Sequence, residues 1–324
     1  MCERWNKIYL KKGIFKTNDY VKKALHDLDF INRIYEKHKT ENYVAGVNRI
    51  PLTIFLSIFL ISFASLTLQI TLTRIFSTTI WYHYAFMAIS IALCGWGLSG
   101  IILHFFKPKF QATNPAVIVL ILLAFSLYIP IYLRAMIQLQ FSLNLISLYY
   151  VISLIPFLLT GMCMAIFYSE YAKHATKLYF ADLAGASFAC FAIEFILNFL
   201  GAESTTLLVG IITTIVAVSL SISTYKHKFV VFSLIILLII GTIFAVSVQY
   251  RIINVAYSPN KNMFNILQQH PELKVSFTKW NSFSRVDVVE GFKEQPRAEI
   301  FIDADASTPI LKWNGRIEDI ENLK

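Results

Sequence analysis

The stretch Leu72–Gly100, LTRIFSTTIWYHYAFMAISIALCGWGLSG, decides the fold class, because it contains most of an apolar run from Tyr84 to Phe105. A helix of that length, rising about 1.5 Å per residue, crosses a hydrocarbon core of about 30 Å. The stretch also contains Gly95-x-Gly97-x-x-Gly100, the spacing of a dinucleotide-binding fingerprint. That fingerprint binds nucleotides only between a strand and the start of a helix. Its position inside an apolar helix excludes that function, and we expect its glycines to pack against other helices.

The composition supports a membrane protein. Of the 324 residues, 56% are hydrophobic and 15% are charged, whereas about a quarter of the residues of a soluble protein are charged. The formal net charge of +9 arises mostly from the two ends of the chain and from alternate short loops. This distribution is typical of membrane topology and not of nucleic-acid binding. We therefore expect the lipid bilayer as a partner, and no nucleic acid.

Seven apolar runs each have the length of about 20 residues that a membrane span requires. They are Ile50–Leu72, Tyr84–Phe105, Pro115–Leu133, Leu145–Tyr168, Leu178–Leu200, Ser204–Ser223 and Phe229–Val248. The sequence therefore predicts an all-α membrane helical bundle of about seven transmembrane helices over residues 50–250. A short C-terminal β-rich segment, residues 251–324, follows it.

The charges of the loops predict the orientation of the bundle. Three alternate loops each contain two lysines, at positions 107 and 109, 173 and 177, and 226 and 228, and the other loops contain only Arg74 and Arg134. The positive-inside rule then predicts a multi-pass protein of the cell (inner) membrane with its N-terminus in the cytoplasm. Seven spans place the segment after Arg251 outside. A re-entrant piece between Ala135 and Tyr168, or an incomplete crossing by Phe229–Val248, would return it to the cytoplasm.

Residues 1–49 form a basic cytoplasmic tail with eleven Lys or Arg and six acidic residues. The apolar core of a cleavable signal peptide is missing, so we expect the first span to act as an uncleaved anchor. Within residues 18–39, apolar side chains recur at helical spacing and predict an amphipathic helix. Such a helix lies on anionic lipid or, alternatively, is solvated and packs on its own protein.

Span two has a face of small residues, which lets a neighbouring helix approach closely. The members of this face are Ala85, Ala88, Ala92, Gly95 and Ser99, and span five has a related set in Ala181, Gly185, Ala189 and Ala192. These two helices are therefore candidates to touch each other. Dimerisation through the same face is the alternative, and a homo-oligomer is compatible with it.

The ionisable residues of the predicted spans form a candidate intramembrane polar site, consisting of Asp182, Glu194 and Arg74. Asp182 is expected in the first turn of span five, where a carboxylate stabilises the exposed amides of the helix end. Glu194 lies deeper, about 18 Å of helical rise away, so the two acids cannot act as a pair. We expect Glu194 to pair with Arg74 or Arg134, and a proton or cation site is the alternative.

The C-terminal segment changes character and has strand-like runs at Lys274–Thr278, Arg285–Glu290 and Glu299–Asp303. Three strands are too few for an independent core, so this segment is expected to dock on a partner. Asp303 and Asp305 lack the glycine and glutamate of a calcium loop and are expected to cap a turn. Standard catalytic and zinc-binding signatures are missing from the sequence. No catalytic, cofactor-binding or metal residue is therefore assigned.

Four blocks of the chain together resemble the multi-spanning membrane relatives of spermidine synthase, the polyamine aminopropyltransferase-like family. They are LTRIFS…WYHYAFMAISIALCGWGLSG, IPFLLTGMCMAIF (Ile155–Phe167), YFADLAGASFACF (Tyr179–Phe191) and KWNSFSRVDVVE (Lys279–Glu290), in the family's order. The resemblance covers Ile50 to Gly315. It implies a membrane region, a short β-stranded segment and then a nucleotide-binding α/β domain for S-adenosylmethionine or its decarboxylated form.

The chain departs from the family after Asp303, because it stops at Lys324 before any strand and glycine-rich loop. The absent nucleotide-binding domain would need on the order of 150 more residues. We therefore expect the membrane half of a spermidine synthase-like transferase, truncated or completed by a separately encoded nucleotide-binding domain, with no cofactor and no activity of its own. The alternatives are a transporter of a small cation or polyamine, and a membrane scaffold or sensor.

Overall fold

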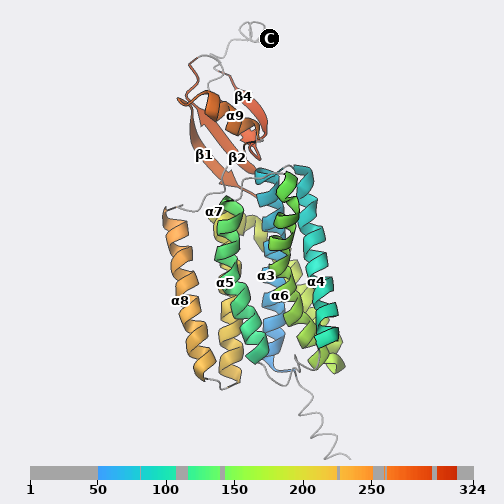
Figure 1. The fold of residues 1–324 in the computed structure, drawn as a ribbon. Helices are drawn as coiled ribbons and strands as arrows, with labels where there is room; N and C mark the ends of the chain where they lie inside the picture. Colours follow the sequence, from blue (N-terminus) through green and yellow to red (C-terminus); the bar gives the residue numbers. More distant parts are fainter. Residues whose placement is uncertain are drawn as a thin grey trace, which may run out of the picture. The chain divides into compact units, whose positions relative to one another are not determined.

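The computed structural model describes residues 50–80, 82–106, 116–138, 143–224, 227–250, 259, 261–293 and 298–311 (Figure 1). The chain divides into two units, Met1–Pro51 and Leu52–Lys324, and all contacts below lie within the second. The predicted basic tail with its amphipathic helix lies outside the described residues.

In the part of the chain that the structure describes, six helices are long and apolar enough to cross a membrane. They are α3 (Leu52–Thr79), α4 (Met87–Phe106, preceded by the 3₁₀ turn η1, Tyr82–Phe86), α5 (Ala116–Gln138), α6 (Ile146–Glu170), α7 (Ala175–Ser223) and α8 (His227–Tyr250). The all-α membrane bundle predicted from the sequence is confirmed. Two further 3₁₀ turns, η2 (Leu143–Leu145) and η3 (Ala172–His174), precede α6 and α7.

Helix α7 accounts for two of the seven predicted spans. Its 49 residues would measure about 74 Å if straight, more than twice the hydrocarbon thickness. The helix is broken at Gly201, whose backbone angles are φ 77° and ψ 170°. Residues 175–200 and 202–223 therefore correspond to the predicted fifth and sixth spans.

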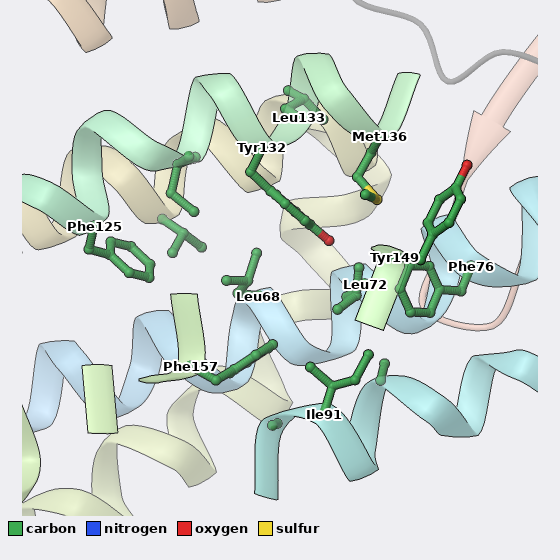
Figure 2. Packing of buried hydrophobic residues seen from close by; sticks show 14 of the residues in the cluster. Leu68, Leu72, Phe76, Ile91, Phe125, Tyr132, Leu133, Met136, Tyr149 and Phe157 are labelled. Atoms are coloured by element: carbon green, nitrogen blue, oxygen red, sulfur yellow. The ribbon is translucent and has the colours of Figure 1, made fainter. Parts of the chain in front are cut away.

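The interior of the bundle is a single large apolar cluster to which α3, α4, α5, α6 and α7 contribute. Figure 2 shows the side chains of α3 facing those of α4, α5 and α6. The largest fully buried members are Phe76, Phe125, Tyr132, Tyr149 and Phe157. Two tyrosines of α5 form hydrogen bonds with α6. The hydroxyl of Tyr132 lies 3.2 Å from the hydroxyl of Ser153, and the hydroxyl of the partly buried Tyr128 donates to the Ile152 carbonyl.

The small-residue face of α4 packs on α6. A methyl group added at Gly95 would lie 2.7 Å from Cβ of Phe157, and one added at Gly161 would lie 3.0 Å from Cα of Trp96. Gly97 and Gly100 have no such neighbours within 4 Å. The expectation that all three glycines of the fingerprint-like motif pack closely is therefore wrong for two of them, because only Gly95 points into the bundle.

The expected contact between spans two and five is also wrong. Gly185 of α7 packs on the backbone of Phe59 in α3, and not on α4. The reason is that the two small-residue faces pack on different helices, that of α4 on α6 and that of α7 on α3. Ala88, Ala92, Gly95 and Ser99 are buried, whereas Ala85 lies in η1 before α4 begins and is only partly buried.

A small α+β unit follows the bundle. Helix α9 (Asn262–Gln269) precedes four strands, β1 (Lys274–Trp280), β2 (Arg285–Glu290), β3 (Ala298–Ile302) and β4 (Ala306–Ile310). The strands form an antiparallel meander in the order β1-β2-β3-β4, with an irregularity between Val275 and Phe277. The helix and the sheet share an apolar core of Met263, Leu273, Val289, Phe301 and Ala304.

The sequence predicted three strands in this segment, and its described residues form four. Asp303 and Ala304 adopt left-handed backbone angles, with φ values of 51° and 60°. They form the turn between β3 and β4, so β3 ends at Ile302 and not at Asp303. The fourth strand escaped prediction because its residues ASTPI lack apolar alternation and are all exposed.

Candidate functional site

The turn between β1 and β2 inserts into the end of the helical bundle. Trp280, the last residue of β1, is only 6% exposed and packs with Ile75 of α3 and with Ile193, Leu197 and Ala202 of α7. The break in α7 makes room for it, since a methyl group added at Gly201 would lie 3.1 Å from Cδ1 of Trp280. Gly201, whose backbone angles only glycine adopts readily, therefore lies against the indole ring.

Asn281 shapes the turn itself. Its side-chain oxygen accepts hydrogen bonds of 2.7 Å from the amides of Phe283 and Ser284, and its own amide donates to the Ser284 carbonyl at 2.9 Å. Asparagine is favoured in turns because its side chain can imitate a backbone acceptor in this way. The result is a rigid tip in which Phe283 is 80% exposed.

Glu194 of α7 is held by this turn. One carboxylate oxygen accepts a hydrogen bond from the Ser282 hydroxyl, and the other accepts one of 2.8 Å from the side-chain amide of Asn198, one helical turn further along. Among the described residues Glu194 has no ion pair with Arg74 or Arg134. The predicted pairing is therefore wrong, because a hydroxyl from a segment distant in the sequence reaches the carboxylate.

Arg74 of α3 is bound to the same turn from another side. Its guanidinium donates to the Phe283 carbonyl, while its Nε is buried and has no hydrogen-bond partner in the described part of the chain. Two of the three residues of the predicted polar site, Glu194 and Arg74, thus contact adjacent residues of one turn. The two side chains are connected through Ser282 and Phe283 of the β1–β2 turn.

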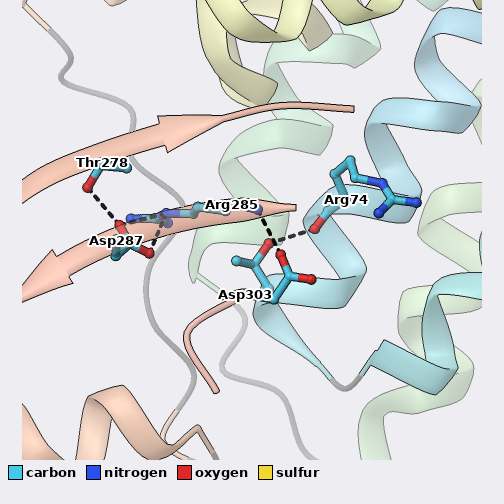
Figure 3. A network of polar contacts seen from close by, with 6 residues as sticks. Arg74, Thr278, Arg285, Asp287 and Asp303 are labelled. Atoms are coloured by element: carbon cyan, nitrogen blue, oxygen red, sulfur yellow. Dashed lines mark hydrogen bonds and ion pairs between the residues drawn. The ribbon is translucent and has the colours of Figure 1, made fainter. Parts of the chain in front are cut away.

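The turn between β3 and β4 is attached to α3 through Asp303. The Ser77 hydroxyl donates to one carboxylate oxygen at 2.6 Å, and the Arg285 amide donates to the other at 2.8 Å. Figure 3 shows Asp303 between strand β2 and the end of α3. The sequence predicted that Asp303 caps a turn. Both hydrogen bonds of its carboxylate instead leave the β3–β4 turn and join it to β2 and to α3.

Lys261 provides a second link to the same helix. Its side chain is 1% exposed, and its ammonium donates to the Ser77 carbonyl at 2.8 Å and lies 3.9 Å from the carboxylate of Asp305. Burial lowers the pKa of this ammonium, and the nearby carboxylates of Asp305 and Asp303 partly oppose the shift. Because Lys261 immediately precedes α9, it ties that helix to α3.

A buried ion pair within the sheet holds the inserted tryptophan. Arg285 Nε lies 3.1 Å from a carboxylate oxygen of Asp287, and the Thr278 hydroxyl donates to the other oxygen at 2.7 Å (Figure 3). The Arg285 guanidinium also lies 5.3 Å from the centre of the Trp280 ring. Removing one partner of such a buried pair is strongly destabilising, because it leaves the other charge buried and unpaired.

Asp182, the third predicted site residue, lies elsewhere. Helix α7 starts at Ala175, so Asp182 is in its second turn and not its first, and the predicted role at the helix end is wrong. The helix begins earlier than the apolar run because it includes the polar residues after η3. The carboxylate of Asp182 instead accepts a 3.3 Å hydrogen bond from Tyr168, and its carbonyl accepts one from Ser62.

Sequence reasoning missed Trp280, Ser282 and Lys261 as contact residues. A turn signal was present in Asn281–Ser284 and another in Gly201–Glu203 between two apolar runs, but nothing local connects them. Only the fold brings together segments that are about 80 residues apart.

The polar groups of this site attach the sheet to the bundle. We call this contact between the β1–β2 and β3–β4 turns and helices α3 and α7 the joint. The carboxylates of Glu194 and Asp303 are occupied by donors from the protein, and the described residues contain no group of three His, Cys, Asp or Glu side chains that could hold a metal ion. The structure therefore describes a helical membrane protein whose C-terminal sheet contacts helices α3 and α7. No family model, no curated protein and no solved structure matches this chain.

Proposed function

We propose that the chain is the membrane part of a spermidine synthase-like protein. In this proposal the bundle anchors the β-meander and holds it in a fixed position as the base for a nucleotide-binding α/β domain. The residues described above have no transferase activity of their own. The main support is the packing of Trp280 against α3 and α7 beside the break at Gly201, which attaches the sheet to the bundle.

The hydrogen bonds of Glu194 favour an anchor over a transporter. A carboxylate on a cation or polyamine pathway faces a water-filled cavity that the substrate can enter. Both oxygens of Glu194 are instead bound, one to Asn198 of the same helix and one to Ser282 of the docked turn. This arrangement supports a structural use of the carboxylate.

Calorimetric titration of the purified chain with S-adenosylmethionine, in lipid nanodiscs, tests the absence of a cofactor site. We expect no saturable binding to this chain, while a soluble spermidine synthase run in parallel supplies the positive control with the decarboxylated cofactor. Saturable binding in the micromolar range would overturn the proposal, because it would locate a nucleotide site within these residues.

The orientation requires its own test. We propose an inner-membrane protein with a cytoplasmic N-terminus, as the loop lysines favour. Leu52 begins α3, and the sheet contacts Arg74 and Ser77 near the other end of that helix. The sheet therefore faces the outside in this orientation. Ser307→Cys, on the exposed strand β4, is expected to react with an impermeant maleimide on intact cells; reaction only after lysis would reverse the orientation.

A further inference from the structure

The tip of the β1–β2 hairpin lies beside the helices of the bundle and not above their ends. Ser282 contacts Glu194, and about 10 Å of helix separates Glu194 from the break at Gly201. Arg74, which binds the Phe283 carbonyl, lies about 7 Å of helix before the end of α3 at Thr79. The two contacts thus come from residues whose backbone lies more than one helical turn before the helix ends, and their side chains reach the tip from that level.

That level corresponds to the boundary between hydrocarbon and headgroups. Helix α3 has 28 residues and is about 42 Å long, whereas the hydrocarbon core is about 30 Å thick. If the excess is shared between the two ends, roughly 6 Å of the helix projects on each side. Arg74 then lies at the boundary, where an arginine side chain can reach lipid phosphates.

The residues around the tip suit this position. Phe283 is 80% exposed, and Phe195 and Phe199, which follow Glu194 on α7, are 56% and 83% exposed. Phenylalanine is one of the residues that interfacial segments bury at the boundary between headgroups and acyl chains. An exposed phenylalanine on a turn surrounded by water would instead lose the free energy of apolar burial.

We propose that the β1–β2 turn inserts into the bilayer and that Phe283 lies among the upper acyl chains of the phospholipids. The hairpin is then a membrane anchor of the sheet in addition to its contacts with α3 and α7. This inference depends on the position of the turn and on its exposed aromatic residue, and it stands whether or not the proposed function is correct.

Spin labelling tests the insertion. All four cysteines are replaced by alanine, and the full chain with Phe283→Cys carries a nitroxide in proteoliposomes. Collision rates with oxygen, which concentrates in lipid, are compared with those of a water-soluble nickel chelate. The matched control is Ile310→Cys on the exposed strand β4. Ile310 pairs with Ala298 and lies at the end of the sheet opposite to the β1–β2 turn.

We expect the ratio of oxygen to nickel collision rates at position 283 to exceed that at position 310 several-fold. Equal ratios at the two positions would overturn the proposal. If Phe283→Cys does not give a monodisperse protein, a photoreactive phenylalanine analogue at position 283 keeps the aromatic ring. Its illumination is expected to yield phospholipid adducts by mass spectrometry, and adducts with water alone would overturn the proposal equally.

Discussion

Gly201→Ala is the substitution that tests the joint between bundle and sheet most directly. With φ 77° and ψ 170°, this residue occupies a backbone region that is open almost only to glycine. The new methyl group would also lie 3.1 Å from Cδ1 of Trp280 and 3.3 Å from a carboxylate oxygen of Glu203. Both effects act at the point where the two halves of α7 and the hairpin meet.

The expected destabilisation follows from these two contributions. Holding a residue with a side chain in this region costs about 1–3 kcal/mol. Overpacking against a buried neighbour adds a further cost of similar size when that neighbour cannot move freely. Trp280 is fixed by Arg285 on one side and by the apolar residues of α3 and α7 on the other. We therefore expect the free energy of unfolding to fall by about 2–6 kcal/mol.

Unfolding by sodium dodecyl sulfate in mixed micelles, followed by tryptophan fluorescence, measures this change. Gly210→Ala is the matched control in the same helix, because its new methyl group would meet Ile129 and Ser126 at ordinary contact distances of 3.5 and 3.6 Å. The control is expected to be as stable as the parent protein or up to about 1 kcal/mol more stable, because alanine favours a helix over glycine. If the two variants differ by less than about 0.5 kcal/mol, the reasoning about the break and its tryptophan is refuted.

Three further predictions use the same protein. Gly95→Ala is expected to destabilise the bundle by about 1–3 kcal/mol through its clash with α6, whereas Gly97→Ala, in open space, is expected to be neutral or up to about 1 kcal/mol stabilising; detergent unfolding compares them. Asp303→Ala removes the acceptor of the Ser77 hydroxyl and the Arg285 amide, so hydrogen exchange of the β3–β4 turn is expected to accelerate by at least tenfold, and unchanged exchange would contradict its role. Because burial lowers the pKa of Lys261 from 10.5, the folded state loses this proton before the unfolded state as pH rises. Stability is therefore expected to increase between the lowered pKa and about 10.5, and to lack this contribution in Lys261→Met.

The membrane-spanning helices could be predicted from the sequence because each is specified locally. An apolar run of sufficient length has few alternatives in a bilayer, since its backbone polar groups must be satisfied within the segment itself. Even the break of α7 was visible, as the polar and small residues 201–203 separated two predicted spans. The number of spans therefore follows from composition and length alone.

The partners of individual residues could not be predicted in the same way. Gly95, Gly97 and Gly100 are equivalent in a sequence motif, but their positions around the helix differ and only Gly95 meets another chain segment. Glu194 was expected to form an ion pair with Arg74 or Arg134, because opposite charge was the basis on which its partner was predicted. Its partner is the Ser282 hydroxyl, 88 positions away, and such pairings depend on how the sheet is docked.

The joint also explains how two incomplete parts stabilise each other. A four-stranded meander with a single short helix has a small core, and it gains the burial of Trp280 from the bundle. The bundle in turn contains Glu194 and Arg74 near one end, and each would lose a hydrogen-bond partner without the β1–β2 turn. Neither part is therefore expected to be fully stable alone. A bundle cut after Tyr250 would expose both charges at the membrane boundary, so the sheet and the helices are expected to unfold together in one transition.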